Sequence, residues 1–308
     1  MERWKIVRAF LLGPLIEAAV PKPGNVNRFR DFEDLTFYHF LFADTAVAGV
    51  YYEAVKTAEL LKKGILEPWE AGLGRLIKRA VKASREAQDA NPNFGIIALS
   101  IPLMMGMAIG KDMLDARKKA RLLIEESTVG DTVEFYRAIR IANPKGIPRG
   151  VKYDVYSDDS FRELFQDEIN LARLAEISCE RELIFCEWLN EYELSYSTFR
   201  RLYELIKELP LEDAVARAFV ELLASNLDTL IIRKAGIEEA KLVQEKAKKV
   251  LSGELTVEEL DAFMREKGDL RNPGSLADIM AVSLSLLVLK GLRIELKDGK
   301  VWGVIGRP

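Results

Sequence analysis

The sequence NPNFGIIALSIPLMMGMAIG, residues 91–110, decides the fold class because none of its side chains is charged. Pro102 interrupts its apolar part, which is shorter than the roughly 18 to 20 apolar residues of a membrane-spanning helix. A helix over residues 96–110 must instead be buried on most sides by other helices of the same chain. The run therefore predicts a large helical core, in which Gly106 and Gly110 mark a close helix crossing.

The segments on both sides of this run have apolar residues three and four positions apart, as amphipathic helices do. We predict helices over residues 43–61, 68–87, 113–125, 132–142, 160–191, 198–207, 212–223, 238–251, 257–267 and 273–289. Strand patterning occurs once, where residues 293–296 and 301–305 flank an Asp-Gly turn. The predicted fold class is all-α, with a short C-terminal β-hairpin.

Residues 143–160, NPKGIPRGVKYDVYSDDS, interrupt the helical pattern with prolines, glycines and alternating charge. This composition predicts a long loop that serves as a lid or a domain junction. Because the helices on each side are amphipathic, we predict one globular domain over residues 1–308 with this loop crossing its surface. The alternative is a domain boundary near residue 150.

The charge balance excludes a protein that binds nucleic acid through its bulk charge, since 45 Lys and Arg face 48 Asp and Glu. The first twenty residues mix charges into an apolar run, which is not the pattern of a signal peptide. We therefore expect a cytoplasmic protein without a membrane partner. Abundant Glu, Lys and Arg beside three glutamines favour a thermophilic source.

The two cysteines lie seven positions apart within the helix predicted over residues 160–191. Two helical turns would separate the Cα atoms of Cys179 and Cys186 by about 10 Å, which is too far for a disulfide. Two free thiols fit a reducing compartment.

Residues 20–40, VPKPGNVNRFRDFEDLTFYHF, carry the strongest functional signal. Two prolines stiffen the backbone around Lys22, and Gly24 permits a reversal of the chain or a ligand close to the main chain. Lys22 and Arg28 supply cations for phosphate oxygens, and the Asn25 amide can donate and accept. The segment predicts a rigid loop that binds an anionic ligand.

Carboxylates follow these cations, and Asp31 stands where a helix is expected to begin, with Asp34 in its first turn. Mg²⁺ usually takes one or two protein carboxylates together with phosphate oxygens. A metal-bound polyphosphate would therefore use both kinds of charge. The alternative is that Asp31 is an N-cap and Asp34 completes a capping-box-like exchange.

Polar residues also stand directly before apolar segments at two other places in the sequence. Asn93 precedes the buried run, where free helix N–H groups favour an anion, or it is an ordinary cap. Asp228 precedes large aliphatic residues and then Arg233 and Lys234. A buried carboxylate must be paired, ligated or protonated, so Asp228 is a functional residue or half of a structural ion pair.

The last long helix begins in a polar motif, NPGSLAD at residues 272–278. Asn272 is a natural N-cap, and Pro273 suits the first helical position. A carboxylate at Asp278, followed by a long apolar run, favours a ligand or substrate role. His39 is the only histidine, so no serine has a histidine partner from its neighbourhood, and the common glycine-rich phosphate loops do not occur.

Five segments in this order resemble the triphosphoribosyl-dephospho-CoA synthase family: PKPGNV (21–26), RDFED (30–34), NPNFG (91–95), DTLIIRK (228–234) and NPGSLAD (272–278). The resemblance covers nearly the whole chain. It implies an all-helical enzyme that joins the ribose-triphosphate part of ATP to dephospho-CoA and expels adenine. Its partners would be small nucleotides, with Mg²⁺ as cofactor and ATP as substrate.

The chain departs from this family in two motifs. Members that prime citrate lyase or malonate decarboxylase have a leucine after the PKPG turn and a Gly-Ala-His-x-Asp-Met stretch, where this chain has Asn25 and residues 27–34. Its last motif reads GSLAD in place of GGSAD or GTTAD. Since these changes touch the region expected to hold the acceptor, ATP use is better supported than dephospho-CoA use.

The resemblance suggests a role for each candidate residue. Residues assigned to the triphosphate and its loop are Lys22, Gly24, Arg28, Arg233 and Lys234. Residues assigned to Mg²⁺ are Asp31, Asp34 and Asp278. Residues that would orient ribose or phosphate oxygens are Asn25, Asn93, Asn272 and Ser275. Asp228 is assigned to proton removal from an acceptor hydroxyl, because a carboxylate can act as general base beside an oxocarbenium-like transition state.

Two other functions fit the same residues. One is a related ATP-dependent phosphotransferase, which would release ADP in place of adenine. The other is a helical protein that binds nucleotide without turnover. A homodimer is also left open.

Overall fold

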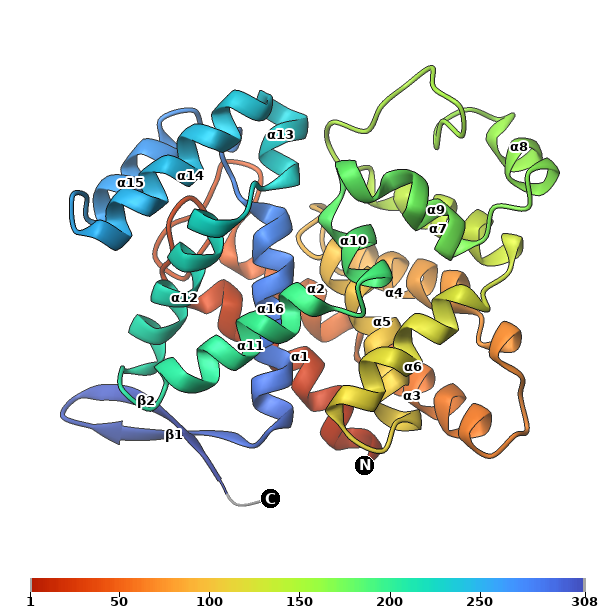
Figure 1. Ribbon diagram of the computed structural model, residues 1–308, viewed down its shortest axis with the longest axis horizontal. Helices are drawn as coiled ribbons and strands as arrows, with labels where there is room; N and C mark the ends of the chain where they lie inside the picture. The colour runs from red at the N-terminus through yellow and green to blue at the C-terminus, as the bar shows by residue number, and fades with distance from the viewer. Residues whose placement is uncertain (1, 307–308) are drawn as a thin grey trace. The chain divides into compact units, whose positions relative to one another are not determined.

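The computed structural model describes residues 2–306, and nearly all of its regular structure is helical (Figure 1). The helices are α1 (Arg3–Ala19), α2 (Phe37–Ala46), α3 (Ala48–Lys62), α4 (Leu73–Ala87), α5 (Phe94–Ile109), α6 (Met113–Glu125), α7 (Val129–Ala142), α8 (Ser160–Gln166), α9 (Leu171–Ser178), α10 (Leu183–Leu189), α11 (Glu193–Leu205), α12 (Leu211–Ser225), α13 (Thr229–Ala235), α14 (Ile237–Ser252), α15 (Val257–Arg265) and α16 (Gly274–Leu289), with 3-10 turns η1 (Pro68–Glu70) and η2 (Cys179–Arg181). The all-α prediction is confirmed.

The predicted C-terminal hairpin is also confirmed. Strands β1 (Leu292–Lys297) and β2 (Lys300–Ile305) pair antiparallel, from Leu292 opposite Ile305 to Lys297 opposite Lys300. Asp298 and Gly299 link them with φ angles of 51° and 73°. Two successive positive φ angles are typical of the tight hairpin turn that an Asp-Gly pair favours.

The chain packs into two compact units. Unit 1 comprises the described residues up to Phe10 together with Phe42–Glu193, and unit 2 comprises Leu11–Leu41 together with residues 194–306. Loop 143–160 lies inside unit 1, and the chain passes between the units near residues 10, 41 and 193. That the whole chain forms one domain stays a prediction.

Helix α5 is the core of unit 1, because every residue from 95 to 108 is buried. Gly106 crosses α6 so closely that a Cβ there would lie 2.2 Å from the carbonyl oxygen of Ala116. Pro102 has no N–H for the carbonyl of Ala98, and the Trp188 indole donates to that carbonyl instead, at 3.2 Å. The Ala98 carbonyl is therefore hydrogen-bonded even though Pro102 cannot donate to it.

Helix α16 is the core of unit 2, where all but three of its sixteen residues are buried. Helix α1 crosses it at Gly13, where a Cβ would lie 2.2 Å from the Ser285 hydroxyl oxygen. Since a side chain at Gly13 would collide with Ser285, this crossing fixes the position of α16, whose first two turns carry Ser275 and Asp278.

The prediction of one helix over residues 160–191 is wrong. The segment contains α8, α9, η2 and α10, because Asn170 caps α9 by accepting from the Arg173 N–H at 2.9 Å, and the chain turns again at η2. That turn brings Cys179 and Cys186 to a Cα separation of 4.6 Å, and the two form a disulfide. The prediction of free cysteines assumed a continuous helix and is wrong for the same reason.

The length and apolar character of the helices bear on the expectation that the protein has no membrane partner. Within residues 2–306, none combines the length and the apolar character that a bilayer crossing requires.

Candidate functional site

The turn PKPGN folds around a buried ion pair in unit 2. The Lys22 ammonium lies 2.9 Å from a carboxylate oxygen of Glu17 and also donates to the Glu17 and Val26 carbonyls, at 2.6 and 3.3 Å. Burial raises the pKa of Glu17 and lowers that of Lys22, and each partner's charge opposes the shift. Lys22 is 2% exposed, so its ammonium holds the turn together from inside.

The outer part of the loop is a tight turn that presents Arg28 and Phe29. Backbone hydrogen bonds join Asn27 and Arg30 in both directions, at 2.9 and 3.1 Å, and the Asn27 side chain accepts from the Phe29 N–H at 3.0 Å. The Arg28 guanidinium pairs with Glu212 at 2.8 Å and stacks over the Phe29 ring. Arg28 and Phe29 are both exposed.

The helix expected to begin at Asp31 begins at Phe37, so its predicted first turn is wrong. The Asp31 carboxylate nevertheless caps α2, because it accepts from the Phe37 N–H at 2.7 Å. Asp34 lies in the connection before the helix, and both carboxylates are exposed. The predicted capping-box-like exchange is wrong, because Asp31 lies six positions before the first helical residue and Asp34 lies outside the helix, although Asp31 does accept from the first N–H group of α2.

Asp228 joins the beginnings of two helices. One carboxylate oxygen accepts from the Ile231 N–H of α13 at 2.9 Å, and the other accepts from the Leu276 N–H of α16 at 2.8 Å. Burial raises the pKa of Asp228 to about 6, although the backbone donors and the charge of Arg233 oppose the shift. The carboxylate is therefore a buried acid whose proton equilibrium lies close to neutral pH.

Asn272 does not cap α16, so that prediction is wrong. The helix begins at Gly274 after Pro273, without a side-chain cap from its own N-cap residue, and Asp228 supplies the cap from α13. Asn272 is 7% exposed, and its side-chain oxygen has no hydrogen-bond partner within the described residues. A buried amide oxygen in this condition can accept a hydrogen bond from a ligand.

Ser275 strengthens the junction of α13 and α16. Its hydroxyl oxygen accepts from the Thr229 hydroxyl at 2.8 Å and from the Leu230 N–H at 3.1 Å. Asp278 follows Ser275 by three positions and therefore lies on the same side of α16, one turn further along. The Lys234 ammonium, at the end of α13, pairs with Asp269 at 2.8 Å.

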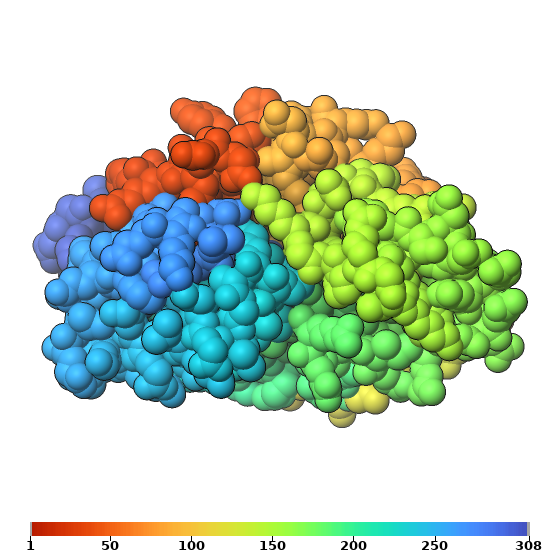
Figure 2. All heavy atoms as spheres, turned by 90° about the horizontal axis from the view of Figure 1, so that it is seen from above, coloured from red at the N-terminus to blue at the C-terminus, as the bar shows by residue number. Residues whose placement is uncertain are grey.

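Helix α15 contributes two residues that the sequence reasoning missed. Asp261 accepts from the Gly24 N–H at 2.8 Å and from the Arg265 guanidinium at 2.9 Å, and it pairs with Arg30. In Figure 2 the red atoms of the N-terminal loop region border the blue atoms of the C-terminal helices. From the sequence, Asp261 and Arg265 are an ordinary acid–base pair four positions apart on a helix, which gave no signal of a role in the loop.

Asn93 belongs to unit 1, whereas the other predicted site residues belong to unit 2. It is the N-cap residue of α5, but its side chain makes no capping bond. The amide donates to Asp44 at 2.8 Å and accepts from the Ser84 hydroxyl at 2.9 Å, and all three residues are buried. These contacts use both ends of the amide within the protein.

Carboxylates suited to a metal are present, but they are not gathered into a metal cage. Across residues 2–306, no three His, Cys, Asp or Glu side chains are grouped so as to hold an ion. A magnesium ion that brings its own phosphate oxygens and waters needs only one or two carboxylates. The exposed acids Asp31 and Asp34 fit that weaker requirement by their chemistry.

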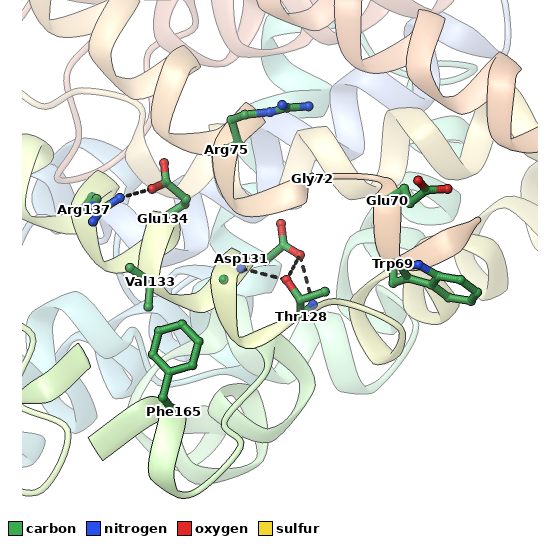
Figure 3. A pocket seen from close by; sticks show the side chains of 11 residues that line it. Trp69, Glu70, Gly72, Arg75, Thr128, Asp131, Val133, Glu134, Arg137 and Phe165 are labelled. Atoms are coloured by element: carbon green, nitrogen blue, oxygen red, sulfur yellow. Dashed lines mark hydrogen bonds and ion pairs between the residues drawn. The ribbon is translucent and has the colours of Figure 1, made fainter. Parts of the chain in front are cut away.

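One surface pocket, of about 500 Å³, lies in unit 1 between the beginnings of α4 and α7 (Figure 3). Asp131 at its centre caps both helices, because it accepts from the Thr128 and Gly74 N–H groups at 3.0 Å each. None of the residues predicted from the sequence lines this pocket.

Comparison with protein families is decisive for this chain. Residues 3–295 match the model of a family described as ATP:dephospho-CoA triphosphoribosyl transferase. The chain belongs to that family. It is accordingly a transferase, and the family's reaction moves the triphosphoribosyl group of ATP to dephospho-CoA, as the sequence resemblance implied.

A solved structure supports the same assignment. The chain is similar to the crystal structure of a proposed triphosphoribosyl-dephospho-CoA synthase from Archaeoglobus fulgidus, with 25% sequence identity and a TM-score of 0.60. The match covers 80% of this chain and 97% of the archaeal chain. Comparison with curated proteins gives no significant match.

Proposed function

We propose that this transferase works with Mg²⁺, releases free adenine from ATP, and uses unit 2 as the centre of its chemistry. The observation that carries the proposal is the junction of α13 and α16. There a buried carboxylate, a serine and an asparagine from two of the family-like motifs meet at two helix beginnings. Because Asp228 already accepts from N–H groups at both helix beginnings, the proposal assigns this junction to proton transfer and to the orientation of ribose oxygens.

In the proposed reaction, the acceptor hydroxyl oxygen forms a bond to the anomeric carbon of the ATP ribose. The bond from that carbon to adenine breaks, and its electron pair leaves with the base. The ribose carries partial positive charge during this exchange, which a nearby carboxylate stabilises. The hydroxyl proton passes to a general base.

Asp228 is the base that we propose. Its pKa of about 6 is close enough to neutral for a carboxylate to be ionised and still accept a proton. Asn272 would accept a hydrogen bond from a ribose hydroxyl with its unused side-chain oxygen, and Ser275 would orient a neighbouring oxygen. Asn25 and Asn93 would also orient ribose or phosphate oxygens. Both amides already have partners in the protein: Asn25 accepts from the Val26 N–H at 2.7 Å and donates to Glu17 at 3.4 Å, and Asn93 contacts Asp44 and Ser84.

The triphosphate would be bound by Arg28, which is exposed at the tip of the loop, and by Arg233 on α13. Lys22 and Lys234, which we also expected to bind phosphate, instead pair with Glu17 and Asp269. They would support the phosphate site through the backbone that they hold. Gly24 would let a phosphate approach the main chain.

Mg²⁺ would be held by the phosphates of ATP and by one or two of the carboxylates of Asp31, Asp34 and Asp278, because within the described residues no three such side chains are grouped around one ion. Bound there, the ion would neutralise part of the triphosphate charge. The proposal also places the protein in the cytoplasm of a thermophile and allows a homodimer. Its disulfide is compatible with this, because intracellular proteins of hyperthermophiles contain disulfides more often than those of mesophiles.

Mass spectrometry of the products tests the proposal directly. The protein is incubated with ATP, Mg²⁺ and dephospho-CoA, and then with a panel of similar hydroxyl acceptors. Free adenine and an acceptor that has gained the triphosphoribosyl group are expected in equal amounts. ADP with a phosphorylated acceptor would instead identify a phosphotransferase, and tight ATP binding by calorimetry without products would identify a nucleotide-binding protein.

A further inference from the structure

One short helix, α15, makes several side-chain contacts to the loop that carries the PKPGN turn. Among the described residues, the backbone–backbone hydrogen bonds of residues 22–35 join positions within the loop itself. Its attachment to the rest of unit 2 therefore depends on side chains. Figure 1 shows the loop, in red, running beside α15.

Besides the Lys22–Glu17 and Arg28–Glu212 pairs, two residues of α15, one helical turn apart, make side-chain contacts to both ends of the loop. Asp261 accepts from the Gly24 N–H at 2.8 Å and pairs with Arg30. Arg265 donates to the carbonyl oxygens of Asn25 and, at 3.3 Å, of Asp31. Together, these two residues bind the loop at both ends of the segment 24–31.

Asp261 and Arg265 are themselves held in fixed positions. The Arg265 Nε lies 2.9 Å from the Asp261 carboxylate, and both side chains are largely buried, with 16% and 12% of their area exposed. Met264, between them on the helix, fills the space beside Gly24, where a Cβ would lie 2.4 Å from its terminal methyl carbon. Gly24 has a φ of 71°, which glycine adopts without strain.

We infer that Asp261 and Arg265 are positioning residues of the transferase, which hold the loop so that Arg28 and the exposed Asp31 meet the magnesium triphosphate in a fixed geometry. Neither residue is placed in contact with substrate. The inference rests on the proposed function, because it assigns the loop to the triphosphate. Catalysis is sensitive to such placement, since a displacement of about 1 Å can cost on the order of a hundredfold in rate.

The test compares Asp261→Ala with Asp261→Asn and with the control Glu258→Ala, which removes an exposed carboxylate from the same helix. Steady-state kinetics of adenine release should show a raised KM for ATP and a lowered kcat in Asp261→Ala, with kcat/KM reduced roughly ten- to hundredfold. Asp261→Asn should recover part of the loss, because its amide oxygen still accepts from the Gly24 N–H. The control should match the unaltered protein.

Hydrogen exchange read by mass spectrometry supplies a measurement that does not depend on activity. Exchange of residues 24–31 should quicken in Asp261→Ala while α14 and α16 keep their protection. If the alanine variant does not fold, Asp261→Asn and Arg265→Lys are measured in its place, since a lysine keeps the charge but cannot reach both carbonyls.

The outcomes separate the two claims. Faster exchange in the loop with unchanged KM and kcat would overturn the inference and leave the proposed function standing. A loss of kcat with unchanged KM, in proportion to the folded fraction, would show a merely structural role and would also overturn it. Absence of adenine release from the unaltered protein would overturn the proposed function, and with it any role of these residues in that reaction.

Discussion

Two acidic residues of unit 2 are held in opposite ways. Asp228 receives backbone N–H groups from two helices and is 2% exposed, whereas Asp261 receives one backbone N–H and two guanidinium groups at the edge of the loop. Backbone dipoles only partly offset the burial of Asp228, and its pKa rises to about 6. The first carboxylate is thus suited to proton transfer, and the second to holding the backbone in place.

The largest effect is expected from removing the Asp228 carboxylate. Asp228→Ala should lower the free energy of unfolding by about 2–5 kcal/mol, because two caps are lost and buried N–H groups lose their acceptor. Adenine release should fall to background. Urea unfolding with a parallel assay would check both. A loss of stability below about 1 kcal/mol would mean that the helix junction does not depend on this carboxylate.

A comparable loss of turnover without a loss of stability is expected at Asp278. Asp278→Asn keeps the shape of the side chain and removes its charge, so a residue that binds the magnesium triphosphate should lose turnover at least about a hundredfold. The melting temperature should stay within a few degrees of the unaltered protein. Collapse of the fold, measured by circular dichroism, would instead favour a structural ion pair in the core.

The raised pKa of Asp228 predicts a pH dependence of stability with a definite sign. Its native pKa of about 6 lies above the ordinary value of 3.8, so the native state binds this proton more tightly than the unfolded state does. The resulting stability is present in full below pH 3.8 and is lost as pH rises to about 6, a change of about 3 kcal/mol.

Asp228→Asn is the matched control for that prediction, because asparagine has the same shape and does not titrate. The difference in unfolding free energy between the two proteins should change between pH 4 and pH 6 and become constant above pH 7. A difference that does not vary with pH would contradict the raised pKa. The same titration should reduce kcat below pH 6, where the proposed base becomes protonated.

The smallest effect is expected far from both carboxylates in the chain, at the disulfide of unit 1. Reduction, or Cys186→Ser, should lower stability by roughly 2 kcal/mol, the value expected for so short a closed loop. Turnover at a temperature where the protein stays folded should be unchanged, because neither cysteine is among the proposed site residues. A loss of activity greater than about threefold under those conditions would show that the segment closed by the disulfide takes part in the reaction.

The sequence predicts those parts of the fold in which one local signal dominates. An uncharged run gives α5, and an Asp-Gly pair between alternating strands gives the hairpin. The same logic fails for residues 160–191, because the helical spacing continues through a cap at Asn170 and a turn at η2. Periodicity reports which side chains are apolar, and it does not report where the backbone reverses.

The candidate site is predictable only in part, for a related reason. The sequence identifies Asp228, Ser275 and Asn272 as unusual polar residues, but it assigns the cap of α16 to Asn272, the neighbour in sequence. The actual cap comes from Asp228, 48 positions away. Asp261 is missed altogether, since its partners at Gly24 and Arg30 are more than 230 positions away.

The buried pair of Glu17 and Lys22 changes how substitutions in the PKPGN motif should be interpreted. Replacing Lys22 alone strands a carboxylate inside the protein, so inactivity of that variant would report an unbalanced interior and say nothing about phosphate contact. Replacing both partners with apolar residues of similar volume, as in Glu17→Leu with Lys22→Met, removes the charges together. Such a double variant that still binds ATP would show that Lys22 has a structural role. A residue of the family motif would then identify the enzyme without contacting its substrate.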